Sequence, residues 1–159
     1  MNKRIILVGP ACSGKTFLRG RLEEKGYHFD VSYTTREKRP DEEYGVDYNF
    51  ISESEFTLRI SQGAFYEHVQ YNGFRYGTGM YEWNNSDCFI METDGIKHIK
   101  PEDRKRSFII YLNIVYLVRA DRMLKRGWTT EKIEERLKTD REKFKNFSDY
   151  DLVITNHNF

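Results

Sequence analysis

The chain has 159 residues, 38% of them apolar and 15% aromatic, which suits one domain with a substantial buried core and argues against disorder. The 26 Lys and Arg residues nearly balance the 25 Asp and Glu residues, so a net charge of +1 provides no global field that would attract nucleic acid or an acidic membrane. The two cysteines lack metal-type spacing, and the sequence shows no signal peptide or long apolar span, so we expect a cytoplasmic protein without membrane or nucleic-acid partners.

The first predicted elements are a strand, a tight loop and a helix. The run "KRIILVGP" is apolar up to a glycine, as in a strand that is buried on both faces. In "GKTFLRGRLEEKG", Phe17, Leu18 and Leu22 share one helical stripe, and Gly26 is placed to end the helix. We expect a second strand in "YHFDVS".

A polar stretch, "SYTTREKRPDEEYGVDY", leads into a segment with the features of a small lobe. The run "VDYNFIS" alternates as a half-buried strand does, and Ser52 with Glu55 forms a capping box for a helix over 53–61. Asn72-Gly73 lies between alternating segments, which is a strong hairpin signal. We therefore expect a partly antiparallel lobe over residues 33–85.

The last part of the chain returns to short apolar strands, "CFIMET", "SFIIYL" and "DLVIT". Helices are expected between them over 114–126 and 131–146. Strands that alternate with helices predict an α/β fold with a parallel sheet covered on both faces. The sequence thus predicts a single domain over 1–159, in which residues 1–32 and 86–159 form the core around the inserted lobe.

A phosphate-binding loop is predicted in "GPACSGKT", which fits G-x-x-x-x-G-K-[ST] between a strand and a helix. Its glycines let backbone N–H groups face phosphates, Lys15 can reach the β- and γ-phosphates, and the Thr16 hydroxyl can ligate Mg²⁺. The alternative is an ordinary glycine-rich turn. The predicted triphosphate site comprises Gly9, Pro10, Ala11, Cys12, Ser13, Gly14, Lys15 and Thr16.

Such a site also needs an acid at the end of another core strand to hold Mg²⁺ and its waters. Glu92 and Asp94, in "CFIMETD", are the candidates. Either of them could instead be an ordinary surface acid at a strand end.

The polar stretch has the residue types that grip a second phosphate. Arg36 and Arg39 offer planar guanidinium forks, and Tyr48 offers a phenol donor. The alternative is a solvated lobe held by salt bridges.

A further group of residues could recognise a nucleobase. The Glu67 carboxylate can accept two parallel N–H bonds from the N1 and N2 edge of guanine. Hydroxyls such as those of Ser32 and Thr78 can donate to guanine O6.

The stretches "SYTTREKRPDEEYGVDYNFIS" and "FYEHVQYNGFRYGT" resemble the acceptor-binding lobe of guanylate kinases. With the phosphate-binding loop and "RMLKRGWTTEKIEERL", the resemblance covers nearly the whole chain. It implies a three-layer P-loop NTPase core with an inserted α+β lobe and a short lid, and Mg²⁺ and ATP as cofactor and donor. The residues that it implies for GMP binding are Ser32, Arg36, Arg39, Tyr48, Glu67, Tyr76, Gly77, Thr78, Glu92 and Asp94.

The resemblance also assigns roles to arginines late in the chain. Arg122, Arg126 and Arg136 correspond to family arginines that close over the transferring phosphoryl group, around a lid near 127–136. Without the resemblance they would be solvated helix charges.

Two departures from the family pattern stand out. The family usually has D-x-D-x-Q-G where this chain has "ETDG", so Glu92 replaces the first Asp among the acids expected to contact the acceptor and the metal. The sequence stops at "VITNHNF", where family members commonly continue into a helix, and Asn156 is the candidate for an adenine contact.

The expected reaction is direct in-line transfer from ATP to GMP or dGMP, by a monomer or homodimer, without a covalent enzyme intermediate. One alternative is a non-catalytic guanylate-kinase-like scaffold, but such domains typically lack a working phosphate-binding loop. Another is a kinase for a different (deoxy)nucleotide or a sugar phosphate, against which the base-reading residues argue.

Overall fold

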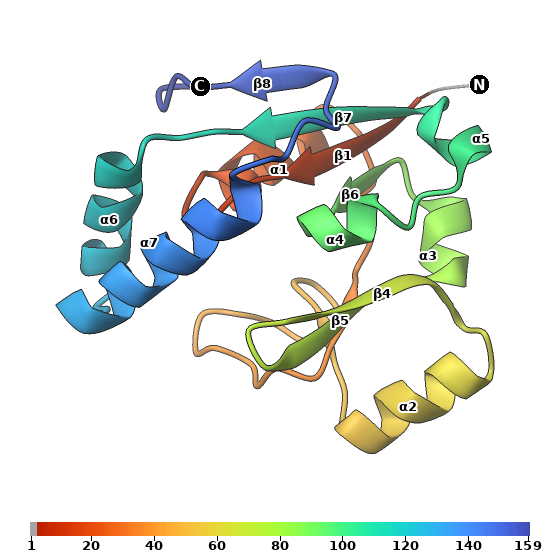
Figure 1. Cartoon of the computed structure of the whole chain (residues 1–159). Coiled ribbons are helices and arrows are strands. Elements are labelled where there is room, and N and C mark those ends of the chain that lie inside the picture. Colours follow the sequence, from red (N-terminus) through yellow and green to blue (C-terminus); the bar gives the residue numbers. More distant parts are fainter. Residues whose placement is uncertain (1–2) are drawn as a thin grey trace.

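The computed structural model describes residues 3–159, and its core is a four-stranded parallel sheet (Figure 1). The strands β1 (Arg4–Val8), β6 (Cys88–Ile90), β7 (Ser107–Leu112) and β8 (Leu152–Ile154) lie in the order β6-β1-β7-β8. These strands were predicted as apolar runs, and the structure confirms the α/β fold.

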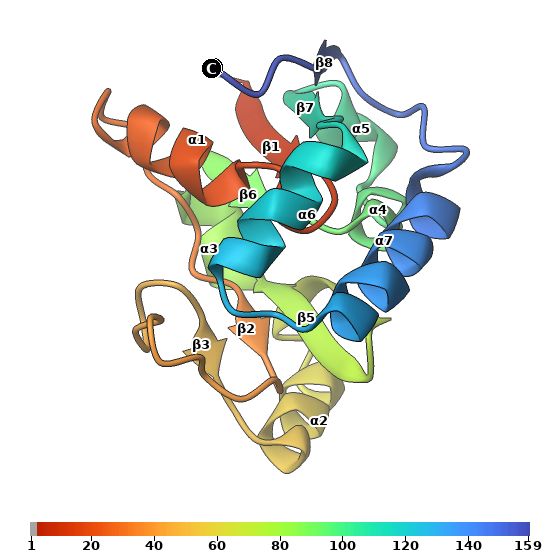
Figure 2. The ribbon, with the colours of Figure 1, turned by 90° about the vertical axis from the view of Figure 1, so that its left-hand side faces the viewer.

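Helices cover both faces of this sheet, because successive residues of a buried strand point to opposite sides. On β1, Ile6 and Val8 pack with residues near α4 (Thr93–Ile96) and with Phe144 of α7 (Thr130–Phe144). Leu7 packs on the other face, which α1 (Lys15–Glu23) covers with Leu18 and Leu22, whereas Phe17 of the predicted stripe is exposed. Helix α6 (Tyr116–Lys125) lies beside α7 at the end of β7 (Figure 2).

The predicted strand in "YHFDVS" is wrong. Only Phe29 bridges to Cys88 of β6, and the chain then leaves the core sheet to begin β2 (Tyr33–Thr34) in the second sheet. Three residues, 30–32, separate the bridge from β2, so the segment is too short to form a regular strand in either sheet.

The second sheet has the order β3-β2-β5-β4 and is mixed, with β3 (Asn49–Phe50) parallel to β2. The predicted hairpin is confirmed as β4 (Phe65–Tyr71) and β5 (Phe74–Gly79), joined by Asn72 and Gly73 with φ of 53° and 82°.

The predicted helix start at Ser52 is confirmed, with the Ser52 half of the capping box present and the Glu55 carboxylate paired with Arg59 instead. The Ser52 hydroxyl accepts from the backbone N–H of Glu55 at 3.1 Å and starts α2 (Glu53–Ser61). Phe56 of this helix stacks on Phe65 of β4 at 4.5 Å, which fixes α2 against the sheet.

Short helices, α3 (Met80–Asn85) and α5 (Pro101–Arg104), were not predicted. Trp83 of α3 is buried and stacks on Tyr66 at 3.8 Å, which joins the second sheet to the core. Within residues 3–159, no helix has the length and apolar character that crossing a membrane requires.

Candidate nucleotide-binding site

A cavity of about 650 Å³ opens between the core sheet and the second sheet. Residues predicted for the donor, the acceptor and the transfer step meet around it. Those that line it are Ala11, Cys12, Ser13, Gly14, Lys15, Thr16, Ser32, Arg36, Arg39, Tyr48, Tyr76, Glu92, Arg122, Arg126 and Arg136. Those that do not are Gly9, Pro10, Glu67, Gly77, Thr78, Asp94 and Asn156.

The phosphate-binding loop has the strand-loop-helix context that its motif requires. It runs from β1 to α1, and Gly14 adopts a left-handed φ of 102° immediately before the helix. A Cβ at Gly9 would lie 2.9 Å from the Leu112 carbonyl oxygen, so only glycine lets the loop pass the end of β7. The loop is therefore packed into the sheet edge.

Lys15 closes this loop from the inside. Its ammonium donates to the carbonyl oxygens of Gly9 and, at 3.0 Å, of Pro10. Burial lowers the pKa of Lys15, which Glu92 and Asp140 partly oppose. The Ser13 hydroxyl is buried in the same loop without a hydrogen-bond partner, so a donor and acceptor remain free for a ligand.

Asp140 of α7 joins the loop to three other elements, and sequence reasoning missed it. Its carboxylate accepts from Ala11 N at 3.1 Å, Arg119 at 2.9 Å, Arg136 at 3.0 Å and the Tyr71 hydroxyl at 3.1 Å. Only 1% of Asp140 is exposed. The i,i+4 spacing of Arg136 and Asp140 was the one signal in the sequence that could have pointed to it.

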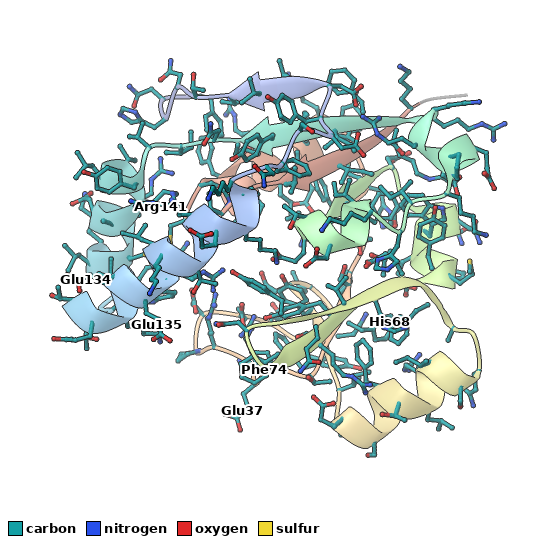
Figure 3. All side chains as sticks on the ribbon, viewed as in Figure 1. Glu37, His68, Phe74, Glu134, Glu135 and Arg141 are labelled. Carbon is teal, nitrogen blue, oxygen red and sulfur yellow. The ribbon has the colours of Figure 1, made fainter. Side chains whose placement is uncertain are left out.

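The three arginines predicted to act in phosphoryl transfer lie on two helices. Arg122 is in α6, Arg126 follows its last residue, and Arg136 is in α7. Arg122 donates to the Cys12 carbonyl at 2.9 Å, and Arg126 caps α6. Arg136 lines the cavity, and the cavity lining does not include Glu134, Glu135 or Arg141 of the same helix. Figure 3 labels these three side chains along α7. Residues 130–136 of the predicted lid form the first turns of α7.

On the opposite wall, Arg36 is held by a bidentate pair with Glu42, at 2.8 and 2.9 Å. The guanidinium lies 5.5 Å from the centre of the Tyr48 ring, and Tyr48 contacts Tyr76 edge-on at 6.1 Å. Burial raises the pKa of Tyr48, so its phenol keeps the proton that it could donate. Arg39, half exposed, lies at the rim.

Glu67 and Thr78 pair directly across the β4–β5 hairpin. The Thr78 hydroxyl and backbone N–H donate to Glu67 Oε1 at 2.8 and 3.2 Å. Glu67 Oε2 is buried without a partner, and burial raises the pKa of this carboxyl. The β2–β5 register, with Tyr33 opposite Gly77, places Ser32 next in line with Thr78. The three predicted base contacts thus lie together, although Glu67 and Thr78 are buried behind the cavity surface.

Asp30 is a second acid that sequence reasoning missed. It lines the cavity with 5% of its surface exposed, and its Oδ2 accepts from the Ser32 hydroxyl at 2.6 Å. Burial raises the pKa of Asp30 to about 7. The strand that the sequence predicts in "YHFDVS" would place the side chains of residues 30 and 32 on one side, which was the signal available for Asp30.

Of the two candidate acids for Mg²⁺, Glu92 lines the cavity and accepts from Lys143 at 2.8 Å. Asp94 is paired with Lys97 at 2.7 Å and lies outside the lining. Within residues 3–159, no three His, Cys, Asp or Glu side chains are grouped to hold a metal ion. Thr16 and Glu92 therefore fit a Mg²⁺ that takes most of its ligands from nucleotide phosphates and water.

Asn156 is exposed and accepts from the Asn158 backbone at 3.0 Å. The neighbouring Phe159 lines the cavity instead, 6.0 Å from Phe17 in an edge-on contact. It also lies close to Gly14, whose added Cβ would be 2.9 Å from its ring. An aromatic wall therefore stands beside the phosphate-binding loop.

The family model for guanylate kinase matches residues 1–159. The chain belongs to the guanylate kinase family. Curated guanylate kinases are 31% identical in Deinococcus radiodurans, 33% in Sus scrofa and 33% in Homo sapiens. These alignments cover 97%, 96% and 96% of this chain, and 68%, 83% and 84% of the respective relatives.

The fold of a guanylate kinase is also found among solved structures. That of guanylate kinase from Anaplasma phagocytophilum matches with a TM-score of 0.71 at 23% identity, covering 98% of this chain and 77% of that one. This similarity supports the predicted α/β fold with its parallel core sheet. Membership of the guanylate kinase family agrees with the resemblance that the sequence motifs indicate.

Proposed function

We propose that this guanylate kinase family member transfers the γ-phosphoryl group of ATP to GMP, and to dGMP, giving ADP and the nucleoside diphosphate. The observation that carries the proposal is that the phosphate-binding loop lines the same cavity as Arg36 and Tyr48. One wall suits a triphosphate and the other suits a monophosphate.

The donor side is formed by the loop and Lys15. The Lys15 ammonium donates to loop carbonyls, and bound phosphates would replace these as its partners. Ser13 has an unpaired hydroxyl beside them. Mg²⁺ held with Thr16 and, through water, Glu92 would neutralise phosphate charge.

The acceptor phosphate fits Arg36, Arg39, Tyr48 and Tyr76. Arg36 is already oriented by Glu42, so little side-chain entropy remains to be lost when a phosphate binds. Tyr48 supplies a neutral phenol donor. The unpaired Oε2 of Glu67 would accept from guanine, while Thr78 holds Oε1 in place.

During transfer, Arg122, Arg126 and Arg136 would neutralise charge that builds up on the phosphoryl oxygens. Asp140 fixes Arg136 at 3.0 Å, so this cation is positioned before substrate arrives. The acceptor is an anion, so in-line attack requires no activated side-chain nucleophile. The protein therefore contributes to phosphoryl transfer by positioning the two nucleotides and stabilising charge.

The same proposal treats residues 33–85 as the GMP-binding lobe and 127–136 as a lid on a core of 1–32 and 86–159. Balanced charge and unpaired cysteines support a cytoplasmic protein that acts on free nucleotides, as a monomer or homodimer.

The deciding experiment is a coupled ADP-release assay with GMP, dGMP, AMP, CMP, UMP and dTMP as acceptors. We expect turnover with the two guanine nucleotides and loss of at least about a thousandfold in Lys15→Ala. Lys138→Ala, a lysine of α7 outside the cavity lining, is the matched control. If no acceptor is turned over, the result supports a binding scaffold. If only acceptors without a guanine base are turned over, the base assignment is overturned.

A further inference from the structure

Asp30 has no role in the reaction proposed above, although it is a buried acid on the wall of the cavity. The residue is 5% exposed and borders the cavity beside Ser32. A buried carboxylate normally has an ion-pair partner. Within residues 3–159, no salt bridge to Asp30 is present, and its hydrogen bond to Ser32 at 2.6 Å is a short one.

The hydrogen bond decides what Ser32 can offer to a ligand. A hydroxyl has one proton, so a Ser32 that donates to an ionised Asp30 presents only lone pairs to the cavity. Guanine O6 and N7 are acceptors, and lone pairs that face them repel. The ionised pair therefore disfavours the edge of guanine that Ser32 is expected to contact.

Protonation of Asp30 reverses this direction. The carboxylic acid donates to Ser32 Oγ over the same 2.6 Å, and the Ser32 proton is then free to donate to O6. We propose that Asp30 is a positioning residue that sets the direction of the Ser32 hydroxyl, so that a guanine nucleotide binds with uptake of one proton. The proton comes from solvent and stays on the Asp30 carboxyl, and no other bond changes. This inference rests on the proposed function.

The charges around Asp30 support a proton equilibrium near neutral pH. Glu67 of β4 and Glu82 of α3 favour the neutral acid, whereas the Ser32 hydrogen bond and Arg19 of α1 favour the anion. Burial raises the pKa of the neighbouring Cys88 of β6, so its thiol is neutral and adds no charge. Arg19 is itself engaged by Glu23 at 2.9 Å. Burial is the largest cause, and the pKa of Asp30 is raised to about 7.

The sign of the pH dependence follows. Below a pH of about 7 Asp30 is neutral and Ser32 can donate to the base. Above it the carboxylate must first take up a proton, so GMP affinity falls as pH rises. With one proton taken up, the dissociation constant rises about fivefold between pH 7 and pH 8.

The experiment measures GMP binding by calorimetry from pH 6 to pH 8.5 in wild type, Asp30→Asn and Asp87→Asn. In Asp30→Asn the new side-chain amide can donate to Ser32 at every pH, so the pH dependence should be lost. Asp87 lies outside the cavity lining, and Asp87→Asn makes the same charge change as a matched control. The second phosphate pKa of GMP, about 6, acts equally in all three proteins and cancels in their ratio.

Repeating the titrations at pH 8 in buffers of different ionisation enthalpy counts the protons taken up. We expect close to one proton for wild type and Asp87→Asn and none for Asp30→Asn, a readout that a purely structural role would not change. Equal proton uptake in wild type and Asp30→Asn overturns the inference and leaves the proposed function standing. Absence of uptake in wild type overturns it even if the variant fails to fold. Absence of GMP binding at every pH overturns the proposed function and this inference together.

Discussion

At the scale of single residues, Glu67 is the side chain on which base selectivity should depend most. Its Oε1 is occupied by Thr78, and its buried Oε2 has no partner in the ligand-free chain. A buried acceptor without a partner is costly, and a ligand that supplies N–H groups recovers that cost. This carboxylate therefore favours a base edge with adjacent donors.

We predict that Glu67→Gln lowers kcat/KM for GMP by roughly a hundredfold or more, because an amide cannot accept from both N1 and N2 of guanine. The KM for ATP should stay unchanged. Steady-state kinetics with each substrate varied in turn checks this, and Glu55→Gln on α2 controls for the change in charge. An unchanged kcat/KM for GMP would show that Glu67 does not contact the base.

Asp30 and Asp140, the two acids of the site that were not predicted, differ in how much of a signal the sequence contains for them. Asp30 lies two residues before Ser32, and the strand predicted there would place both side chains on one side. Asp140 sits in a highly charged helix, and its importance comes from Ala11, Tyr71 and Arg119, which the fold brings from distant parts of the chain. No local sequence pattern predicts contacts between residues so far apart in the chain.

At the scale of elements, α6 and α7 are held to the phosphate-binding loop by the Asp140 carboxylate. We predict that Asp140→Ala lowers the free energy of unfolding by about 3–5 kcal/mol, since it leaves Arg119 buried without its partner. Urea denaturation measures the loss. Asp121→Ala on α6 removes an exposed pair with Lys125 and should cost less than about 1 kcal/mol, so similar losses in both variants would refute the role of Asp140.

Helix α4 approaches the base-reading side chains closely through Gly95. A Cβ at this position would lie 2.9 Å from Glu67 Oε2, so the carboxylate would have to shift from the position in which Thr78 holds it. We predict that Gly95→Ala raises the KM for GMP about tenfold and leaves the KM for ATP unchanged. Substrate-saturation curves for both nucleotides provide the measurement.

Gly20 of α1 is the matched position for this test, because an added Cβ there meets nothing within 4 Å. Gly20→Ala should leave both KM values unchanged and stabilise the helix by about 0.5–1 kcal/mol. If the two alanine variants behaved alike toward GMP, the close approach of α4 would have no part in base binding.

Elements could be predicted from sequence where they are long or carry local signals. The hairpin at Asn72-Gly73, the Ser52 cap and the apolar core strands are all confirmed. The predicted strand in "VDYNFIS" is confirmed as the two residues of β3, whereas the two-residue strand β2 has no pattern of its own, because it exists only through pairing with its neighbours. The strand predicted in "YHFDVS", residues 27–32, was wrong because this apolar segment crosses from one sheet to the other.

At the scale of the whole molecule, the second sheet touches the core across the cavity through Tyr71. This residue ends β4, and its hydroxyl donates to Asp140 of α7 at 3.1 Å. Its ring also lies 4.9 Å from Arg136 and 3.4 Å from the Lys143 ammonium. A single aromatic side chain thus helps to hold the two sheets at one distance across the cavity.

We predict that a ligand carrying both nucleotides closes the cavity further, and that Tyr71→Phe opens the ligand-free chain. Closure excludes water that would otherwise accept the phosphoryl group. Small-angle scattering should give wild type a smaller radius of gyration with a bisubstrate analogue than without one. Ligand-free Tyr71→Phe should be larger than wild type, because its Asp140 contact is lost, and should match it when the analogue is bound. Tyr81→Phe, on an exposed ring of α3, should follow wild type in both states. Identical profiles with and without the analogue would show that the two sheets do not move, and the phosphoryl group would then be protected by side chains alone.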